Sequence, residues 1–398
     1  MKNIFLVQIL FLFTVLTSCS TEECTVSPVG SNLSEELQTL INQEYDSYQA
    51  KYPSFPGGIA FQIQYENEDV FVQKGFQTPI SSSHHIRAQS ITKTFTAAGV
   101  MLLHQKGLLN IHHNITDTIP NSNNTYIPDT RNYNIPYKDQ IRIWDLLTHR
   151  AGVFDPVNDD TFFLDSVLAE HPDYTFSLDE IIGESTRLQK SYFQPGTGYH
   201  YSNAGYVILA KIIERVSEKS YKQFMNDEFV IPLSLLDTSF PDIGTDQNLP
   251  TPFVDSWYWS PPESMNATEQ NMTYDIGEGN MISSSQDLSK FFKLLLNGEA
   301  GISSTNVNNY MMDVRPTSDV GALSVGAGLE YFNNLGFGKG GDGAGFTIRC
   351  FYDPTKNFMI TGFFNCWNYK DRNVSYFAEQ QRNLYELLYK IKQETLDN

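Results

Sequence analysis

The chain has 398 residues, of which 40% are hydrophobic and 18% are charged. This balance is typical of a folded globular protein and excludes an intrinsically disordered chain. The length fits one large enzyme domain or two interleaved ones. The 46 acidic residues outnumber the 27 Lys and Arg, and the net charge is −19. Because so acidic a chain is repelled by nucleic acid, we predict no nucleic-acid partner and interpret the charge as a contribution to solubility.

Residues 1–18 resemble an export signal. A positive start precedes an almost unbroken apolar run at 4–16, which is too short to span a bilayer comfortably. The run ends in Leu16-Thr17-Ser18-Cys19, which resembles a bacterial lipoprotein cleavage box. We predict that the signal is removed, that Cys19 carries a lipid, and that 19–32 forms a polar tether. The protein is then a periplasmic or outer-membrane lipoprotein; an ordinary signal peptide with an incidental Cys is the alternative.

The first predicted elements are a helix and a hairpin. Apolar residues recur at helical spacing over 33–50, and a Pro- and Gly-rich break at 53–58 ends that helix. Two strand-like runs, 59–65 and 70–76, follow as a hairpin. A second helix with an apolar face is predicted over 90–109.

The pattern from 111 to about 274 indicates mainly helices and loops. Four helical stretches are predicted over 143–148, 178–189, 204–217 and 221–229. The segment 120–137 is rich in Asn, Pro and Tyr, which favours a surface loop.

The last part of the chain returns to strands. The elements predicted there are a helix, two strands and a final helix, over 283–297, 345–352, 358–364 and 375–391. Cys350 and Cys366 belong to the two strand-like runs. If the connecting turn is centred near Thr355, Cys350 lies opposite about position 360, so we predict no disulfide between the two cysteines.

Because strands occur at both ends of the chain and helices in the middle, we predict an α/β sandwich. One antiparallel sheet is built from both chain ends, is flanked by helices, and has an inserted all-helical domain. In this prediction one domain covers 33–398, and its α/β part consists of about 33–110 and 275–398. The helical part covers about 111–274.

Ser90 and Lys93 form the chain's single Ser-x-x-Lys tetrad, at the start of the helix predicted from residue 90. At this spacing the two side chains lie on one face, within hydrogen-bond reach. A Ser hydroxyl needs a base to become a nucleophile, and a buried Lys can serve. The helix N-terminus also favours an oxyanion formed at Ser90. Such tetrads arise by chance, and a solvated Lys on a helix is the alternative interpretation.

Tyr201-Ser202-Asn203 follows a Pro-Gly turn and opens a predicted helix. A Tyr hydroxyl can shuttle protons, and an Asn amide can bind a substrate carbonyl or hold Lys93. Tyr-x-Asn also occurs at 65–67 and 331–333, but the first lies at a hairpin turn and the second lacks the Pro-Gly lead and a following helix. An ordinary buried aromatic residue is the alternative for Tyr201.

Gly338-Lys339-Gly340-Gly341 stands just before the strand predicted from residue 345. Small residues allow a strand edge to approach a substrate closely, and Lys339 supplies positive charge. The same stretch satisfies a G-x-G-x-x-G pattern, but it leads into a strand and not a helix, so a dinucleotide site is excluded. Since neither C-x-x-C nor H-E-x-x-H occurs, we predict no metal site.

In this order, the three motifs resemble those of the penicillin-recognising serine enzymes. The closest resemblance is to the class C β-lactamase-like serine hydrolases, which include DD-peptidases, D-amino-acid peptidases and esterases. Three connecting segments, at 143–153, 231–240 and 283–288, are also similar to this family. The resemblance covers about 33–370.

The resemblance implies a β-lactamase/transpeptidase-like fold and an acyl-enzyme mechanism without a cofactor. Ser90 is then the acylated nucleophile, and Lys93 and Tyr201 share the acid and base roles. The backbone amides of Ser90 and Asp342 form the oxyanion hole. The substrate-binding residues implied by the family motifs are Asn203, Lys339, Gly340 and Gly341.

Gly340 departs from the family, which often has a hydroxyl residue at this position. Because a hydroxyl that binds a substrate carboxylate is missing, we expect neither an efficient β-lactamase nor a D-Ala-D-Ala carboxypeptidase. We predict an envelope serine hydrolase that cleaves a small peptide, amide or ester and meets the membrane through its lipid anchor only. A slowly reacting penicillin-binding sensor and a scaffold lipoprotein are the alternatives. The complete set of motif residues favours the hydrolase. The sequence carries no signal for the number of subunits, so we make no prediction of the oligomeric state.

Overall fold

A computed structural model describes residues 32–260, 262–317, 324–343, 345–368 and 376–397. The predicted signal segment, Cys19 and nearly all of the tether lie outside these residues. Within the described ranges, no helix is both long enough and apolar enough to cross a membrane.

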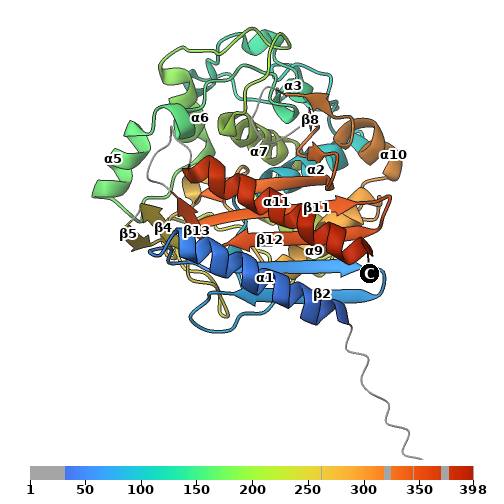
Figure 1. Cartoon of the computed structure of the whole chain (residues 1–398). Coiled ribbons are helices and arrows are strands. Elements are labelled where there is room, and N and C mark those ends of the chain that lie inside the picture. Colours follow the sequence, from blue (N-terminus) through green and yellow to red (C-terminus); the bar gives the residue numbers. More distant parts are fainter. Residues whose placement is uncertain (1–31, 261, 318–323, 344, 369–375, 398) are drawn as a thin grey trace, which may run out of the picture.

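An eight-stranded antiparallel sheet forms the centre of the molecule, in the order β2-β1-β12-β11-β10-β9-β8-β7 (Figure 1). Its strands are β1 (Ile59–Tyr65), β2 (Glu68–Lys74), β7 (Arg315–Pro316), β8 (Ser324–Val325), β9 (Glu330–Phe332), β10 (Gly336–Gly343), β11 (Phe346–Asp353) and β12 (Phe358–Phe364). Strand β1 pairs with β12 from Ile59 opposite Phe364 to Tyr65 opposite Phe358. This pairing joins the two ends of the chain in one sheet, which confirms the predicted fold class.

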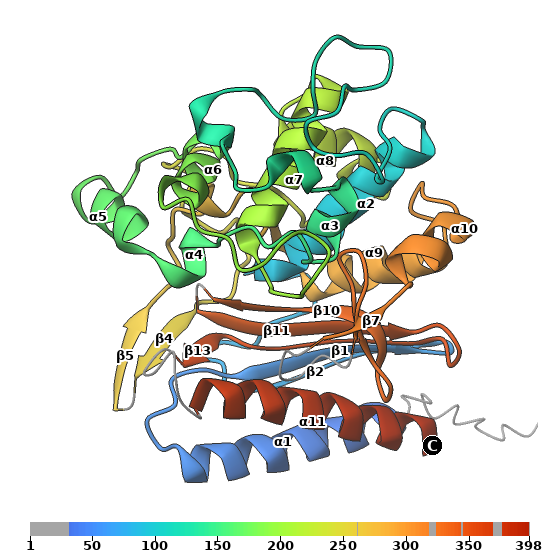
Figure 2. The same cartoon turned by 90° about the horizontal axis from the view of Figure 1, so that it is seen from above.

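Two helices from opposite ends of the chain cover the outer face of the sheet, α1 (Asn32–Lys51) and α11 (Tyr376–Asp397) (Figure 2). Leu37 and Ile41 of α1 are fully buried, as are Leu384 and Leu388 of α11. Each pair stands four residues apart, so its side chains lie on the same helix face. Full burial of one such aliphatic side chain contributes about 1.5–3 kcal/mol, which holds both helices against the strands.

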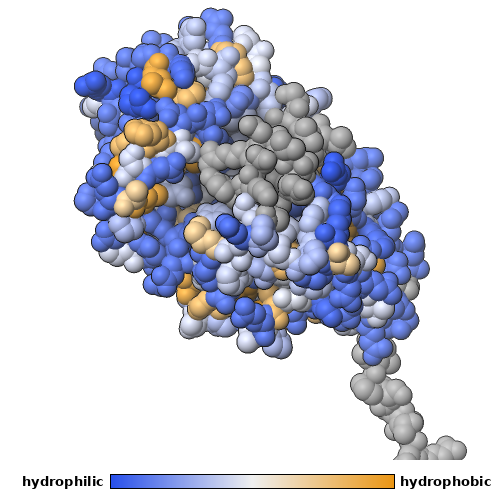
Figure 3. Space-filling model, turned by 60° about the vertical axis from the view of Figure 1, so that its left-hand side comes forward, coloured by the Kyte–Doolittle hydropathy of each residue, from blue (hydrophilic) through white to orange (hydrophobic). Residues whose placement is uncertain are grey.

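The opposite face of the sheet carries α9 (Ser285–Leu296) and α2 (Thr92–Gln105), with the remaining helices beyond them (Figure 2). These are α3 (Ile143–Leu147), α4 (Pro156–Asp159), α5 (Phe162–Glu170), α6 (Leu178–Arg187), α7 (Asn203–Ser217), α8 (Tyr221–Met225) and α10 (Ser304–Asn306). The short strands outside the main sheet are β3 (Ile86–Arg87), β4 (Trp257–Ser260), β5 (Glu263–Asn266), β6 (Ile282–Ser283) and β13 (Cys366–Asn368). The inserted segment is therefore mainly helical rather than all-helical, because β4 and β5 also lie in it. Figure 3 shows a face that is mostly hydrophilic, with hydrophobic residues in small separate groups.

The glycine-rich strand β10 differs from the sequence prediction, which has Lys339, Gly340 and Gly341 just before a strand. They lie inside a strand that pairs with β11 from Phe337 opposite Tyr352 to Gly343 opposite Phe346. Glycine has a weak strand propensity, so the local sequence carries little strand signal. Pairing with the neighbouring strand determines the conformation.

Other elements also differ from their predicted bounds or character; the helix predicted over 221–229, for example, ends as α8 at Met225. The second hairpin strand begins at Glu68, two residues before the predicted start, and α11 extends beyond residue 391. The segment 120–137 does not lie wholly on the surface, because Tyr126 and Tyr133 are buried. The Tyr133 hydroxyl donates a hydrogen bond to the Asp179 carboxylate of α6.

The β11–β12 hairpin places Cys350 opposite Thr361, one residue from the predicted position 360. The Thr361 hydroxyl contacts the Cys350 sulfur at 3.2 Å. Cys350 and Cys366 are both buried free thiols.

Candidate active site

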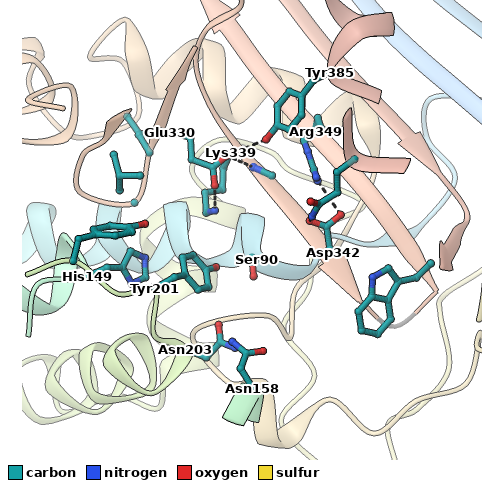
Figure 4. A pocket seen from close by; sticks show the side chains of 17 residues that line it. Ser90, His149, Asn158, Tyr201, Asn203, Glu330, Lys339, Asp342, Arg349 and Tyr385 are labelled. Carbon is teal, nitrogen blue, oxygen red and sulfur yellow. Dashed lines mark hydrogen bonds and ion pairs between the residues drawn. The ribbon is translucent and has the colours of Figure 1, made fainter. Parts of the chain in front are cut away.

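Ser90 lies in the short 3-10 turn η1 (Gln89–Ile91), between β3 and α2. The sequence predicts an α-helix from residue 90, whereas α2 begins at Thr92 and ends at Gln105. The predicted proximity of the tetrad is nevertheless present: Lys93 Nζ donates a hydrogen bond to Ser90 Oγ at 3.0 Å. Lys93 is completely buried, whereas Ser90 lines a cavity (Figure 4).

Glu278 is the counter-ion of Lys93. The Lys93 ammonium donates to a Glu278 carboxylate oxygen at 2.5 Å and to the Glu278 backbone carbonyl at 2.9 Å. The side chain of Glu278 is 4% exposed, so the two charges interact away from solvent. Asp275 hydrogen-bonds Glu278, and burial, followed by the nearby Glu278 charge, raises the pKa of Asp275 well above its usual range. The raised pKa favours the protonated form of Asp275 beside the Lys93–Glu278 pair.

Tyr201 extends from the residues before α7, whose first turn is capped by the Ser202 hydroxyl. Its own hydroxyl is within hydrogen-bond reach of Ser90, and its ring centre lies 5.0 Å from Lys93 Nζ and 5.2 Å from Lys339 Nζ. Burial raises the pKa of Tyr201 although Lys339 acts to lower it, so the phenol stays protonated at neutral pH.

His149 holds the Tyr201 ring in place. The two rings stack with their centres 4.4 Å apart (Figure 4), and His149 Nδ1 accepts a hydrogen bond from the Ser202 backbone amide at 3.2 Å. Burial, followed by the positive charge of Lys93, lowers the pKa of His149 well below its usual range. The imidazole is thus neutral, and its contacts orient Tyr201.

Asn203 is the first residue of α7 and lines the cavity beside Ser90. Its backbone amide donates to Asp155 at 2.9 Å, and Asp155 also accepts from the Val157 amide and the Asn158 side chain. Burial raises the pKa of Asp155 to about 7. The sequence analysis offers two roles for the Asn203 side chain, to bind a substrate carbonyl or to hold Lys93. The second role belongs to Glu278, which accepts the hydrogen bond from the Lys93 ammonium.

Strand β10 supplies Lys339, whose ammonium forms a buried ion pair with Glu330 of β9 (Figure 4). Burial, the largest single effect, acts to lower the pKa of Lys339, but the charge of Glu330, the nearby Tyr201 and the hydrogen bond to Glu330 together raise it. Gly341 lets β10 approach Ser90: a Cβ at this position would lie 2.6 Å from the Ala88 carbonyl oxygen and 3.0 Å from the Ser90 nitrogen. Any larger residue would force the strand away from Ser90.

Gly340 faces Arg349, a buried residue of β11. A Cβ at position 340 would lie 3.1 Å from the guanidinium of Arg349, so the arginine occupies the space that a side chain there requires. Arg349 in turn donates to the Asp342 carboxylate at 3.0 Å (Figure 4). Arg349 thus fills the space beside Gly340, and Lys339 and Arg349 are each paired with an acidic residue.

Two cavities meet at Ser90, with volumes of about 410 Å³ and 370 Å³. The first is lined by the motif residues Ser90, Tyr201, Asn203, Lys339 and Gly340 together with Asp342. The structure thus brings together three motifs that are more than a hundred residues apart in the sequence. Among the described residues, no group of three His, Cys, Asp or Glu side chains is arranged to hold a metal ion.

Sequence reasoning missed four charged residues of the site. They are Asp155, Glu278, Glu330 and Arg349. None belongs to one of the three motifs, and each acts through a partner from another element. Only Glu278 has a local signal in the sequence, because it stands between two glycines in Gly277-Glu278-Gly279. A Glu in this context indicates a charged residue in a turn that packs closely against other backbone.

The fold and this arrangement define a β-lactamase-like serine hydrolase. The sequence matches the family described as Beta-lactamase over residues 57–382, and the chain belongs to that family.

Two curated relatives match part of the chain. Penicillin-binding protein 4* of Bacillus subtilis (strain 168) is 26% identical over 211 residues, which are 52% of this chain and 42% of the relative. Protein flp of Staphylococcus aureus (strain NCTC 8325 / PS 47) is 25% identical over 279 residues, 66% of this chain and 49% of the relative. The chain therefore spans less than half the length of these relatives.

Two solved structures share the fold over most of the chain. The D-amino acid amidase from Ochrobactrum anthropi SV3, complexed with L-phenylalanine amide, has a TM-score of 0.73 and 22% identity, and the match covers 91% of this chain and 99% of that one. The D-stereospecific amidohydrolase from Streptomyces sp. has a TM-score of 0.70 and 22% identity, with 82% and 94% covered.

Proposed function

We propose that this protein hydrolyses amide or ester bonds of small substrates through an acyl-enzyme on Ser90. The observation that carries the proposal is the hydrogen bond from the buried Lys93 ammonium to Ser90 Oγ, at 3.0 Å. A lysine with no catalytic partner would not be kept completely buried beside a serine at the junction of two cavities.

The Lys93–Glu278 pair supplies the base in this proposal. The Lys93 ammonium lies 2.5 Å from the Glu278 carboxylate, so a proton can pass from Lys93 to Glu278 and leave a neutral amine beside Ser90. The amine takes the Ser90 proton while Oγ attacks the substrate carbonyl. The backbone amides of Ser90 and Asp342 stabilise the oxyanion.

The leaving group departs with the proton that Ser90 gave up. The neutral Tyr201 phenol, close to Ser90, passes this proton on from Lys93 and is reprotonated in the same step. Water then attacks the acyl group, its proton follows the reverse path, and Ser90 is released. The roles of Asn203, Lys339, Gly340 and Gly341 in substrate binding belong to the same proposal.

Amide substrates are favoured over carboxylate-bearing penicillins. Lys339 is paired with Glu330 and Arg349 with Asp342, so neither cation faces the cavity without a counter-ion. Two structural neighbours, a D-amino acid amidase and a D-stereospecific amidohydrolase, also support an amide substrate.

The test is active-site labelling of the purified protein with a fluorophosphonate and with a fluorescent penicillin, compared with Ser90→Ala. We expect the phosphonate to label the protein, with a slower reaction of the penicillin and no adduct in Ser90→Ala. Ser47→Ala, on the exposed side of α1, is the matched serine control and should label as the original protein does. If neither reagent forms an adduct that depends on Ser90, the hydrolase proposal is wrong.

We also propose that Cys19 carries a lipid, which makes the protein an exported bacterial lipoprotein of the periplasm or outer membrane. The apolar run at 4–16 and the small residues before Cys19 support this proposal. Cys19→Ala should move the protein from the membrane to the soluble fraction and remove the added mass of the lipid. Unchanged fractionation would contradict the anchor.

A further inference from the structure

Three buried cations of the site each have an acidic partner. The pairs are Lys93–Glu278, Lys339–Glu330 and Arg349–Asp342. Since the chain has 46 acidic residues and only 27 Lys and Arg, counter-ions are abundant. A cation beside the catalytic cavity that has no acidic partner is therefore an exception, and its charge is available to a ligand.

Arg150 is this exception. Its Nη2 donates a hydrogen bond to the Pro316 carbonyl oxygen at 3.3 Å, and within the described part of the chain no acid forms an ion pair with it. The nearby charge of Asp145 is paired with Arg142 at 2.7 Å. Arg150 Nε is buried, but Nη1 is neither buried nor hydrogen-bonded among the described residues. The outer end of the guanidinium thus keeps free donors.

Arg315 brings a second positive charge to the same place. It precedes Pro316, which accepts the hydrogen bond from Arg150. Burial, and next the positive charge of Arg315, lowers the pKa of Arg150, so the two guanidinium groups are close. Arg315 has an ion pair with Asp313 at 3.5 Å, but both side chains are 49% exposed, and such a surface pair is weak. Two like charges are therefore held together without a strong counter-ion.

The two arginines lie at the edge of the 410 Å³ catalytic cavity. The Arg150 guanidinium carbon is 5.5 Å from the centre of the Tyr199 ring, and Tyr199 lines the cavity. Arg315 stands directly opposite Val325 in the sheet, so both side chains project from the same face, and Val325 also lines the cavity. The Arg315 guanidinium carbon is 5.9 Å from the centre of the Trp144 ring. The aromatic rings orient the guanidinium groups, which limits the entropy lost when an anion binds.

We propose that Arg150 and Arg315 bind a carboxylate of the substrate at the edge of the catalytic cavity. A guanidinium group binds a carboxylate through two parallel N–H···O bonds, and the second arginine adds to the attraction. The site is separate from Lys339, so this carboxylate lies away from the bond that is cut. The preferred substrates are amides with a remote carboxylate, such as that of an acidic side chain or a peptide C-terminus. This inference rests on the proposed function, because the amide of the same substrate lies at Ser90.

The experiment compares ligands that differ in one charge. Adipamic, suberamic and sebacamic acids have a primary amide at one end and a carboxylate at the other, whereas adipamide, suberamide and sebacamide have a neutral amide at both ends. Each compound is tested for protection of Ser90 against fluorophosphonate labelling, at low and at high salt. The acid whose length spans the distance from Ser90 to the arginines should protect best. We expect it to bind about 10-fold more tightly than its diamide at low salt, with a smaller difference at high salt.

Two variants test the arginines. Arg150→Gln keeps a polar side chain but removes the charge, and we expect it to reduce the preference for the acid at least about 5-fold. Arg315→Gln should reduce it by about 2-fold, because this side chain is more exposed. A purely structural role of Arg150 would weaken protection by the acid and by the diamide equally and would leave their ratio unchanged.

Arg131→Gln is the matched control. Arg131 begins the 3-10 turn η2 (Arg131–Tyr133), is exposed, and lines neither cavity at Ser90. The substitution removes the same charge from the protein but not from the proposed site. It should leave the preference for the acid as it is.

Three results would overturn the inference: equal protection by every acid and its diamide, a preference that persists in both Arg150→Gln and Arg315→Gln, or an equal loss of preference in Arg131→Gln. A lack of protection by all six compounds would overturn it as well. In each of these cases Ser90 is still labelled, so the proposed function stands. If Ser90 is not labelled at all, the proposed function fails and the inference fails with it.

Discussion

The Lys93 ammonium donates a 2.5 Å hydrogen bond to the Glu278 carboxylate, and both side chains are almost completely shielded from water. A buried charge of either sign is strongly disfavoured without its partner. Loss of either partner would therefore leave the other charge buried without a counter-ion beside Ser90.

Removal of Glu278 is expected to affect stability and acylation together. Glu278→Ala leaves the Lys93 charge unpaired and should lower the free energy of unfolding by about 3–5 kcal/mol, measured by denaturant titration. Glu278→Gln retains an acceptor but not the charge, and the rate of phosphonate labelling should fall at least 100-fold. Glu228→Gln, which breaks the surface pair with Lys106, should change stability by less than about 1 kcal/mol. Labelling of Glu278→Gln at the original rate would contradict a role for the pair in acylation.

Glu330→Gln should increase the reactivity toward anionic ligands. The substitution leaves Lys339 without its counter-ion, so the cavity gains an uncompensated positive charge. We expect penicillin labelling, relative to labelling by an uncharged phosphonate, to rise about 10-fold at low salt and less at high salt. The measurement is the ratio of the two labelling rates. A ratio that does not increase would show that the carboxylate of penicillin is excluded for another reason.

Asp155 is expected to make stability depend on pH between about 4 and 7. Its pKa is raised from 3.8 to about 7 in the folded protein, so the folded state binds more protons than the unfolded state in this range. The contribution of Asp155 to the free energy of unfolding is thus highest at low pH. It decreases as the pH rises and is constant above the pKa of Asp155 in the folded protein. Since one pKa unit corresponds to about 1.4 kcal/mol, the expected decrease is a few kcal/mol.

Asp155→Asn isolates this contribution. The difference in unfolding free energy between the original protein and the variant, measured at several pH values, should shift in favour of the variant from pH 4 to pH 7. A difference that is constant over this range would show that Asp155 has the same pKa in both states.

Gly340→Ser should destabilise the protein although it adds a hydroxyl to the cavity. The new side chain would meet the Arg349 guanidinium, since even a Cβ lies only 3.1 Å from it. Overpacking of this kind costs about 1–3 kcal/mol, which thermal unfolding would detect. Gly205→Ala on α7 is the contrast, because the nearest atom to its new Cβ is 3.7 Å away and the substitution should be neutral or stabilising by up to about 1 kcal/mol. Equal stability of Gly340→Ser and the original protein would mean that Arg349 moves freely.

The sequence alone predicted the fold class, the family and the order of the motifs. Helical and strand periodicities are local, so the terminal helices and the β11–β12 hairpin are readable from neighbouring residues. The spacing of Ser90 and Lys93 is also local, and the hydrogen bond between them follows from it. The assignment of roles to these residues stays a prediction that labelling will test.

Only the tertiary structure decided which charges meet at the site. Glu278 reaches Lys93 across 185 residues of sequence, and Arg349 occupies the space beside Gly340 because β10 and β11 pair in one particular register. A propensity or a spacing describes neighbours along the chain, whereas a buried ion pair depends on two elements packed so that neither charge keeps its water. The sequence therefore determined the proximity of Ser90 and Lys93, and packing determined the counter-ions of the site.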